Sequence, residues 1–410
     1  MGTESERPTT APRRGELDVL RALVVLGLVF FHAGLVFSPD DDFYVKNAGT
    51  TDAVTVMAGL GVVWAMPLLF LVAGLGTRHS IRRRGPGGFV RERLLRLGVP
   101  LVFATVVLCP LPQWLRLRAA DPGYHESYGE FWTRFLSVRP DPADFPFVLE
   151  GEHFETGHLW FVVLLLAFSL LLAPVAAPLA AGGARTADAV SRRPFLLFLP
   201  ALPLALINTL LGLEENFAGW HRWAYLLFFL YGFALADDDR VRSAMRRLAV
   251  PAGVAGLLLF LATAPGFLTE DDPFTAWTPV ALVTRALFSA AGWCLMVAIL
   301  GRLDRPREQR SQEWRPPSPV MGYLVVAALP LYVLHQPVVV AFAYGVVGWS
   351  APIVVKYAVI VAASLAVILL VYEYVVRRTR VTRFLFGMRP DAGTRPDAGM
   401  RPDPPTRPVP

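Results

Sequence analysis

Arg21, His32 and His335 are ionisable side chains inside long apolar runs, where such residues are rare. Arg21 and His32 belong to LDVLRALVVLGLVFFHAG, and His335 belongs to LYVLHQPVVV near the end of the chain. Arg21 and His32 are eleven residues apart, so on a helix both project from one face, roughly 16 Å apart along the axis. An imidazole at such a place can take a proton, carry an acyl group or hold a substrate. A structural histidine is the alternative for His32 and His335, and a membrane-surface anchor is the alternative for Arg21.

A second group of candidates is basic and precedes an apolar run. Arg93 and Arg96 stand at i and i+3 in RERLLRLGVP, so they share one face of a helix. Guanidinium groups bind phosphate oxygens through paired hydrogen bonds, which indicates a site for a phosphorylated ligand. The alternative is the excess of arginine that any cytoplasmic loop collects. Glu373, late in the last apolar run, is expected near the same surface, where it either holds one of these arginines or is an ordinary surface carboxylate.

A third candidate, His158, begins the apolar run GHLWFVVLLL. Glu152, His153 and Glu155 precede it, but neither HExxH nor another metal-ligand spacing is present, so no metal site is expected. We interpret those three as ordinary loop residues and His158 as a substrate contact. No nucleophile elbow, phosphate-binding loop or dinucleotide glycine pattern occurs in a supporting context.

The composition restricts the class of protein that uses these residues. The chain has 410 residues, 39 basic against 33 acidic side chains, and is 54% hydrophobic and only 18% charged. These values exclude a soluble enzyme, a nucleic-acid binder with a basic surface and a disordered scaffold. Cys109 and Cys294 both lie in apolar runs, which excludes a disulfide framework and a cysteine-based metal site. The sequence therefore predicts an all-α, polytopic transmembrane helix bundle.

Ten apolar runs are candidates for membrane-spanning helices, each of which needs about 20 residues. They are 17–37, 53–77, 94–112, 158–180, 195–213, 221–236, 248–268, 279–301, 320–348 and 351–376. The sixth is short, and the ninth is interrupted by Pro330 and Pro337. The first lacks a cleavage site and leads into further spans, so we interpret it as a helix rather than a signal peptide. The expected organisation is a segment 1–16, a membrane domain 17–380 and a disordered Pro/Arg-rich tail 381–410.

Charges between the runs predict the orientation. Basic segments alternate with acidic ones: the basic ones are RHSIRRRGPGGFVRERLLR, DDDRVRSAMRR, RLDRPREQRSQEWR and VRRTRVTRF, and the acidic ones include SPDDD, LEEN and TEDD. Because basic loops stay in the cytoplasm, both termini and the tail are expected to be cytoplasmic. His32 and His335 then each lie fifteen residues from the cytoplasmic start of an outward-running helix. Their rings are expected at nearly the same depth in the membrane.

Four elements in this order resemble the acyltransferase 3 family. They are Arg21-x10-His32, FLVAG at 70–74, Arg93-x-x-Arg96 followed by LGVP, and LYVLHQP. The segments MPLLFLVAGLGTRHS and GHLWFVVLLL are similar to the branch of the glucan biosynthesis protein C type. The resemblance extends from residue 17 to about residue 378. One departure is Ala73, which stands where the family often has serine.

The resemblance implies transfer of an acyl group, of the acetyl or succinyl type, from cytoplasmic acyl-CoA to a hydroxyl on the outer face. The acceptor would be a sugar, a glucan or a secreted metabolite. CoA phosphates would contact Arg93 and Arg96, with Arg21 at the channel entrance. His32 would act as base or acyl carrier, and His335 would orient His32 or hold the acceptor. Acyl-CoA is then a co-substrate, no cofactor is tightly bound, and the partners are the lipid bilayer and the substrates in the plasma membrane.

The rival interpretation is a transporter or permease, because intramembrane histidine and arginine also mark substrate pathways. Internal repeats would favour that class, and the two halves of this sequence show no convincing similarity. A scaffolding membrane protein would leave His32 and His335 unexplained.

Overall fold

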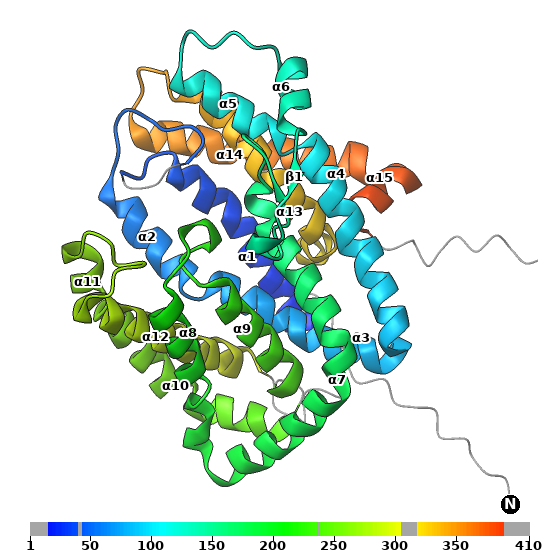
Figure 1. Ribbon diagram of the computed structural model, residues 1–410, viewed down its shortest axis with the longest axis vertical. Coiled ribbons are helices and arrows are strands. Elements are labelled where there is room, and N and C mark those ends of the chain that lie inside the picture. The colour runs from blue at the N-terminus through cyan, green and yellow to red at the C-terminus, as the bar shows by residue number, and fades with distance from the viewer. Residues whose placement is uncertain (1–14, 40–42, 236–237, 305–317, 389–410) are drawn as a thin grey trace, which may run out of the picture.

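The protein is an all-α bundle, as the sequence predicts (Figure 1). The computed structural model describes residues 15–39, 43–235, 238–304 and 318–388. The long helices are α1 (Gly15–Leu35), α3 (Ala65–Arg93), α7 (Trp160–Arg192), α10 (Asp239–Leu261), α12 (Pro279–Leu303), α13 (Pro319–Val346) and α14 (Ile353–Val371). The shorter ones are α2 (Asp52–Val62), α4 (Val99–Val107), α5 (Pro110–Ala120), α6 (Tyr128–Phe135), α8 (Ala201–Leu211), α9 (Arg222–Leu235), α11 (Ala264–Thr269) and α15 (Arg380–Leu385).

Three short helical segments that carry predicted site residues, and one small sheet, lie between or beside these helices. Two of the helical segments are π-helical, η1 (Leu94–Gly98) and η7 (Tyr372–Val376), and one is a 3-10 turn, η3 (Gly157–Leu159). Strands β1 (Arg139–Pro140) and β2 (Leu149–Glu150) form an antiparallel pair in the loop between α6 and η3.

Eight helical segments in the described part of the chain are long and apolar enough to cross a membrane. Every one of the ten predicted runs falls on a helix, but two of them, 53–77 and 94–112, lie in the single segment Asp52–Ala120. The run 221–236 forms α9, whose 14 residues are fewer than the roughly 20 that a span requires. The side of the membrane on which the termini lie stays a prediction from the loop charges.

The segment Asp52–Ala120 reverses direction at Gly85 and is not one continuous rod. Gly85 has φ 71° and ψ 170°, which only glycine adopts at little cost, and Pro86 follows it. Arg93 Nη2 lies 2.8 Å from Thr77 Oγ1, 16 residues earlier. A straight helix would separate these residues by about 24 Å. The two predicted runs therefore lie on either side of a turn. The basic segment RHSIRRRGPGGFVRERLLR contains this turn.

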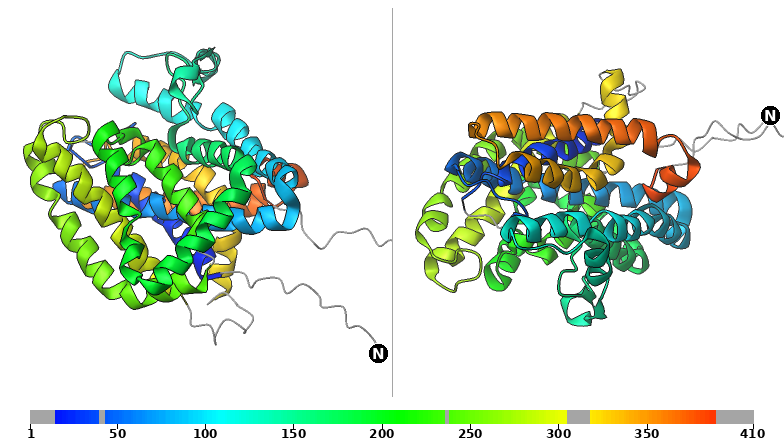
Figure 2. Two further views of the ribbon diagram at one scale, coloured as in Figure 1. Left: turned by 60° about the horizontal axis from the view of Figure 1, so that its bottom comes forward. Right: turned by 90° about the horizontal axis from the view of Figure 1, so that it is seen from above.

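Helices α1 and α13, which carry His32 and His335, pack against each other, and α14 contacts both of them (Figures 1 and 2). Helix α13 continues through Pro330 and Pro337, where the sequence suggests an interruption. Residues 331–335 are all buried, so the segment that carries His335 lies in the interior of the bundle.

Helices α3 and α9 approach closely through two glycines. A Cβ atom added at Gly74 would lie 1.9 Å from the carbonyl oxygen of Phe229, and one added at Gly232 would lie 1.9 Å from that of Leu71. Small residues allow helix backbones to come this close in membrane proteins. Gly74, which belongs to the FLVAG element, therefore has a packing role.

Replacing Gly74 with alanine should destabilise the bundle, because the new methyl group meets backbone that cannot move aside. Overpacking of this kind costs typically about 1–3 kcal/mol, so the thermal midpoint of the purified protein in detergent should fall. Gly76→Ala is the matched control, since no atom lies within 4 Å of a Cβ at Gly76 on the same helix. Equal midpoints for the two variants would contradict the close approach.

The folded part of the chain extends past residue 381, where the sequence places the start of the tail. Helix α15 packs against α4, and Gly387 then turns the chain with φ 65°. Its carbonyl oxygen lies 3.5 Å from Arg96 Nε. The predicted disordered tail from residue 389 and the predicted cytoplasmic segment before residue 15 lie outside the described residues.

Candidate functional site

Three histidine rings from distant parts of the chain meet inside the bundle. The ring centroids of His32 and His335 are 5.0 Å apart, and those of His158 and His335 are 4.9 Å apart. His32 comes from α1, His335 from α13 and His158 from η3, at the start of α7. The prediction that His32 and His335 lie at one depth is confirmed. His158 joins the same cluster, which the sequence did not predict.

Pro337 explains how His158 is held. A proline inside a helix lacks the N–H that would bond the carbonyl four residues earlier, and here that carbonyl belongs to Val333. The Val333 oxygen lies 3.0 Å from His158 Nε2, so the His158 ring takes the place of the missing helix donor. Tyr332 completes the clamp, because its hydroxyl donates to the backbone oxygen of His158.

The backbone contacts also assign the protons on two of the rings. His335 Nδ1 lies 2.5 Å from the carbonyl oxygen of Tyr332, and a carbonyl can only accept, so Nδ1 carries the hydrogen and Nε2 carries the lone pair. The same reasoning places the hydrogen of neutral His158 on Nε2. Among the described residues, His335 Nε2 and His32 Nδ1 are buried and have no hydrogen-bond partner. One unpartnered atom therefore lies on each of two rings in contact.

Aromatic side chains surround the cluster. Phe31 and Phe43 pack against the His32 ring at centroid distances of 5.2 Å and 5.8 Å. Tyr332 packs against His335. His335 is completely buried, whereas His32 is partly exposed. Of these two histidines, His32 is the one that a substrate can approach.

The second site is an arginine cluster at the turn of α3 and η1. Arg93 donates to Thr77 Oγ1 and lies over the Phe89 ring, with its guanidinium carbon 5.1 Å from the ring centroid. Arg96 belongs to η1 and pairs with Glu92 at 3.6 Å. The structure thus fixes Arg93 by a hydrogen bond and an aromatic face.

Glu92 is the organising carboxylate of this arginine cluster. It pairs with Arg84 at 2.8 Å and with Arg96, and it accepts a hydrogen bond of 2.9 Å from Ser80 Oγ. Two arginines therefore pair with one carboxylate, and Arg93 lies in the same segment with Thr77 as its hydrogen-bond partner, so this region carries an excess of positive charge that suits an anionic ligand. Neither Glu92 nor Thr77 is among the residues predicted from the sequence. The contact of Thr77 with Arg93 and that of Glu92 with Arg84 form across the chain reversal at Gly85, whereas the pair of Glu92 with Arg96 has the local spacing i, i+4.

Arg21, on α1, is the third arginine predicted from the sequence. Its side chain is 44% exposed and pairs with Asp18 at 3.5 Å, as the spacing predicts. By contrast, Arg78 donates to the carbonyl oxygens of Phe233 and Ala234 at the end of α9, so this arginine of the same loop has a structural role.

The structure corrects the expected pairing of Glu373. Its carboxylate pairs with Arg377 at 2.6 Å and accepts a hydrogen bond of 3.1 Å from Tyr323, and within the described chain it holds neither Arg93 nor Arg96. The reason is local, since Arg377 lies one helical turn further along and meets it directly. These contacts fit the second alternative, an ordinary surface carboxylate, and a role of Glu373 in substrate binding stays a prediction.

The loop before His158 is more ordered than the sequence suggests. Tyr44 donates a hydrogen bond to Glu155. Burial, followed by the neighbouring Glu155 carboxylate, raises the pKa of Tyr44 well above the ordinary value of a phenol. Tyr44 therefore stays protonated and remains a donor. Glu155, expected to be an ordinary loop residue, instead ties the loop to the segment that follows α1.

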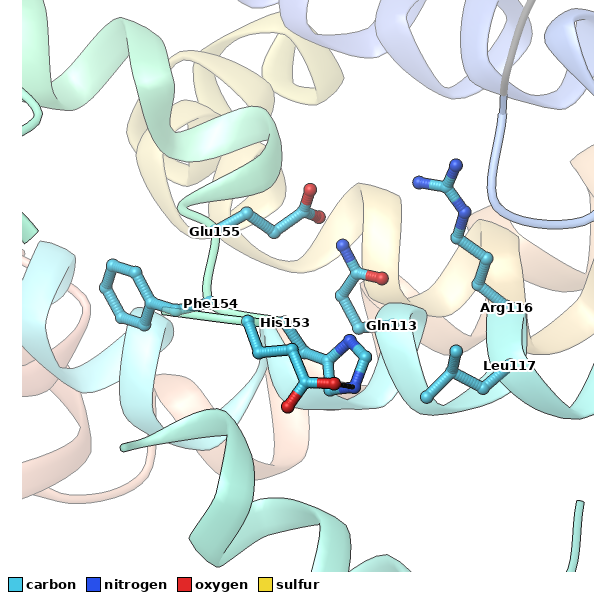
Figure 3. Close-up of a pocket in the computed structure, with 7 residues that line it drawn as sticks. Gln113, Arg116, Leu117, His153, Phe154 and Glu155 are labelled. Atoms are coloured by element: carbon cyan, nitrogen blue, oxygen red, sulfur yellow. Dashed lines mark ion pairs between the residues drawn. The ribbon is translucent and has the colours of Figure 1, made fainter. Parts of the chain in front are cut away.

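A pocket of about 370 Å³ opens beside this loop, as Figure 3 shows. Helix α5 forms one wall and residues 152–155 form the other. The lining residues are Gln113, Arg116, Leu117, Glu152, His153, Phe154 and Glu155. His153 Nε2 lies 3.4 Å from Glu152. Among the described residues, no group of three or more histidine, cysteine, aspartate or glutamate side chains is arranged to hold a metal ion.

Known proteins with similar sequences point to one family. A family model described as an acyltransferase domain matches residues 14–373. Proteins named Glucans biosynthesis protein C from Salmonella paratyphi B and Salmonella enteritidis are 23% identical to this chain over 405 residues, and the one from Salmonella typhi is 23% identical over 400 residues. Each of these alignments covers 93% of this chain and 96% of the relative. No solved structure matches the chain at a comparable significance.

Proposed function

The chain belongs to the acyltransferase 3 family, and from this premise we propose that it transfers an acyl group from acyl-CoA to a hydroxyl of a carbohydrate acceptor, with His32 as the base. The multiple apolar helices make it a multi-pass membrane protein. The observation that carries the proposal is the contact between His32 and His335, two ionisable rings inside an apolar bundle. Ionisable groups in that position are costly and are retained for function.

The unpartnered ring atoms support a division of roles between the two histidines. His335 Nδ1–H donates to the Tyr332 carbonyl, so the lone pair of His335 lies on Nε2, on the other side of the ring. We infer that this lone pair receives Nδ1–H of His32 after a small rotation of either ring. The remaining nitrogen of His32, Nε2, is then unprotonated and can act as a general base. His335 is the positioning residue in this scheme.

The transfer step follows from this arrangement. His32 Nε2 takes the proton of the acceptor hydroxyl, and the hydroxyl oxygen attacks the carbonyl carbon of the thioester. The carbon–sulfur bond breaks, an ester forms, and the CoA thiolate receives the proton from His32. An acyl-histidine intermediate on His32 is the second route that the family resemblance allows. Trapping a covalent acyl-protein in the absence of acceptor would distinguish the two routes.

The arginine cluster supports the donor side of the proposal. CoA carries several phosphate groups, and Arg93 and Arg96 present guanidinium forks beside one carboxylate, Glu92. Arg96 lies in the π-helical turn η1, and π-helical turns occur often at functional sites. Arg21 would contribute a further positive charge on the path between the two clusters.

The name of the relatives, Glucans biosynthesis protein C, supports a glucan as the acceptor, and the acyl group is proposed to be acetyl or succinyl. The basic loops support a cytoplasmic location for the arginine cluster and therefore for CoA. The plasma membrane is the proposed location, because the reaction then delivers acyl groups to an acceptor outside the cytoplasm.

The proposal is tested by the release of CoA thiol from acetyl-, propionyl- and succinyl-CoA by the purified protein supplied with neutral glucose oligomers. Thiol release by the wild type, and a higher donor requirement in the Arg93→Ala/Arg96→Ala pair, would support the reaction and the donor site. CoA should also raise the thermal midpoint, because a ligand that binds the folded state stabilises it. A protein that neither releases thiol nor gains stability from CoA would contradict the proposal and favour a transporter.

A further inference from the structure

We propose that the pocket between α5 and residues 152–155 binds the acceptor, and that it takes an uncharged, polyhydroxylated ligand such as a short segment of a neutral glycan. This inference rests on the proposed function and adds the place and the chemistry of the acceptor. The pocket volume of about 370 Å³ is within the range usual for small-molecule sites.

Gln113 is the residue that points most directly to a ligand. Its side chain is only 8% exposed, yet within the described chain its amide makes no hydrogen bond. In Figure 3 the amide projects into the pocket from α5, between Glu155 and Arg116. The amide therefore faces the open space of the pocket, where it can exchange hydrogen bonds with water for hydrogen bonds with a ligand. A ligand that both donates and accepts would satisfy it.

The other lining residues provide the complementary groups. Arg116 supplies donors, while Glu152 and Glu155 supply acceptors. Leu117 and Phe154 supply apolar surface. Each hydroxyl of a sugar donates one hydrogen bond and accepts others, and its C–H faces pack against apolar side chains. A mixed lining of this kind therefore fits a polyhydroxylated ligand better than an apolar one.

The charges of the pocket favour a neutral ligand over an anionic one. Two carboxylates, Glu152 and Glu155, stand against the single guanidinium group of Arg116. The arginine cluster at α3 and η1 has the opposite balance, with two guanidinium groups paired with Glu92. The protein thus has one site suited to a phosphorylated donor and a separate one suited to a neutral acceptor.

The pocket is connected to the histidine cluster through two short chains of contacts. Glu155 accepts a hydrogen bond from Tyr44, and the neighbouring Phe43 packs against His32. Glu155 also lies three residues before His158. Gly157 allows the tight turn between them, because its φ is 48° and an added Cβ would lie 3.0 Å from the Tyr44 hydroxyl.

Helix α5 provides a rigid wall for this pocket. It packs against α13, which carries His335. The thiol of Cys109, just before α5, lies 3.6 Å from the carbonyl oxygen of Thr156. Both walls of the pocket are therefore held on elements that also contact the histidine cluster.

The test compares Gln113→Ala and Glu152→Gln with wild type in the CoA-release assay, using neutral glucose oligomers of two to six units. The loss of hydrogen bonds to the ligand should raise the acceptor KM about tenfold, with the KM for acyl-CoA unchanged. Glu152 is largely exposed, so its variant should fold normally. The matched control is Glu150→Gln, a nearby exposed carboxylate that pairs with Arg139 outside the pocket.

Unchanged acceptor KM values in both pocket variants, or equal changes for donor and acceptor, would overturn the inference. Calorimetric binding of a glucose hexamer to the purified protein keeps the test independent of acyl transfer. Weaker binding of the hexamer to Gln113→Ala would support the pocket as the acceptor site even if no CoA is released. The binding test and the transfer test can therefore fail independently. Absence of binding, or equal binding of a sulfated hexamer, would contradict a site for a neutral glycan.

Discussion

Replacing His32 with alanine should reduce acyl transfer by roughly 10²–10⁴-fold, which is the usual contribution of a general base. The affinity for CoA should stay unchanged, because the His32 ring lies in the histidine cluster and not among the arginines. His335→Ala should reduce kcat in the same direction, since it removes the group that orients His32. The rate of thiol release at saturating donor and acceptor measures both effects.

The double variant gives a sharper result than either single one. Residues that act as a unit have non-additive effects, so His32→Ala/His335→Ala should be about as slow as His32→Ala alone. His125, an exposed histidine in the loop that follows α5, provides the control, and His125→Ala should retain wild-type activity. Normal turnover by His32→Ala would contradict the proposed base.

Replacing Arg93 with alanine should raise the KM for acyl-CoA by about 10–100-fold. Hydrogen bonds to charged groups contribute about 1.5–3 kcal/mol, and each 1.4 kcal/mol corresponds to a factor of ten. Arg93→Lys should recover only part of this loss, because lysine keeps the charge but not the planar fork that Thr77 and Phe89 hold in place. Initial rates over a range of donor concentrations measure the effect.

A shortened donor separates phosphate binding from general damage. Acyl-pantetheine lacks the nucleotide phosphates, so Arg93→Ala and wild type should use it equally poorly. Arg91→Ala is the matched control, because Arg91 is an exposed arginine of the same loop. Equal defects with acyl-CoA and acyl-pantetheine would mean that Arg93 supports the fold rather than the donor.

Hydropathy and residue spacing were sufficient to predict the bundle and the common level of His32 and His335, whereas their contact is seen in the structure. A bilayer requires long apolar helices, so each span is visible as a run in the sequence. Equal distance from the expected cytoplasmic ends then placed the two histidines at one depth. The prediction succeeded because both helices are regular over this distance, α13 even through its prolines.

Other features depend on contacts between distant segments. His158 joins the cluster because Pro337 leaves the Val333 carbonyl for it. Glu92 is the carboxylate of the arginine cluster, where it pairs with Arg96 four residues later and with Arg84 across the turn at Gly85. The pair with Arg96 has a local spacing that the sequence shows, whereas the pair with Arg84 and the place of His158 depend on how the chain folds back. Pro337, two residues after His335, was the available signal for the place of His158, because a proline within a helix leaves the carbonyl four residues earlier without its helical donor.

We propose that an acyl group passes from CoA on one side of the membrane to a hydroxyl on the other, with His32 as the base. Sealed vesicles test this proposal most directly. They contain acyl-CoA labelled in the acyl group, and neutral glucose oligomers are added outside. Protease protection establishes that the basic loops of the protein face inward. The account predicts labelled oligomer outside for the wild type and none for His32→Ala. Two results would contradict the proposal. One is labelling of the outer oligomer that does not depend on His32, and the other is release of thiol inside wild-type vesicles without labelling of the acceptor outside.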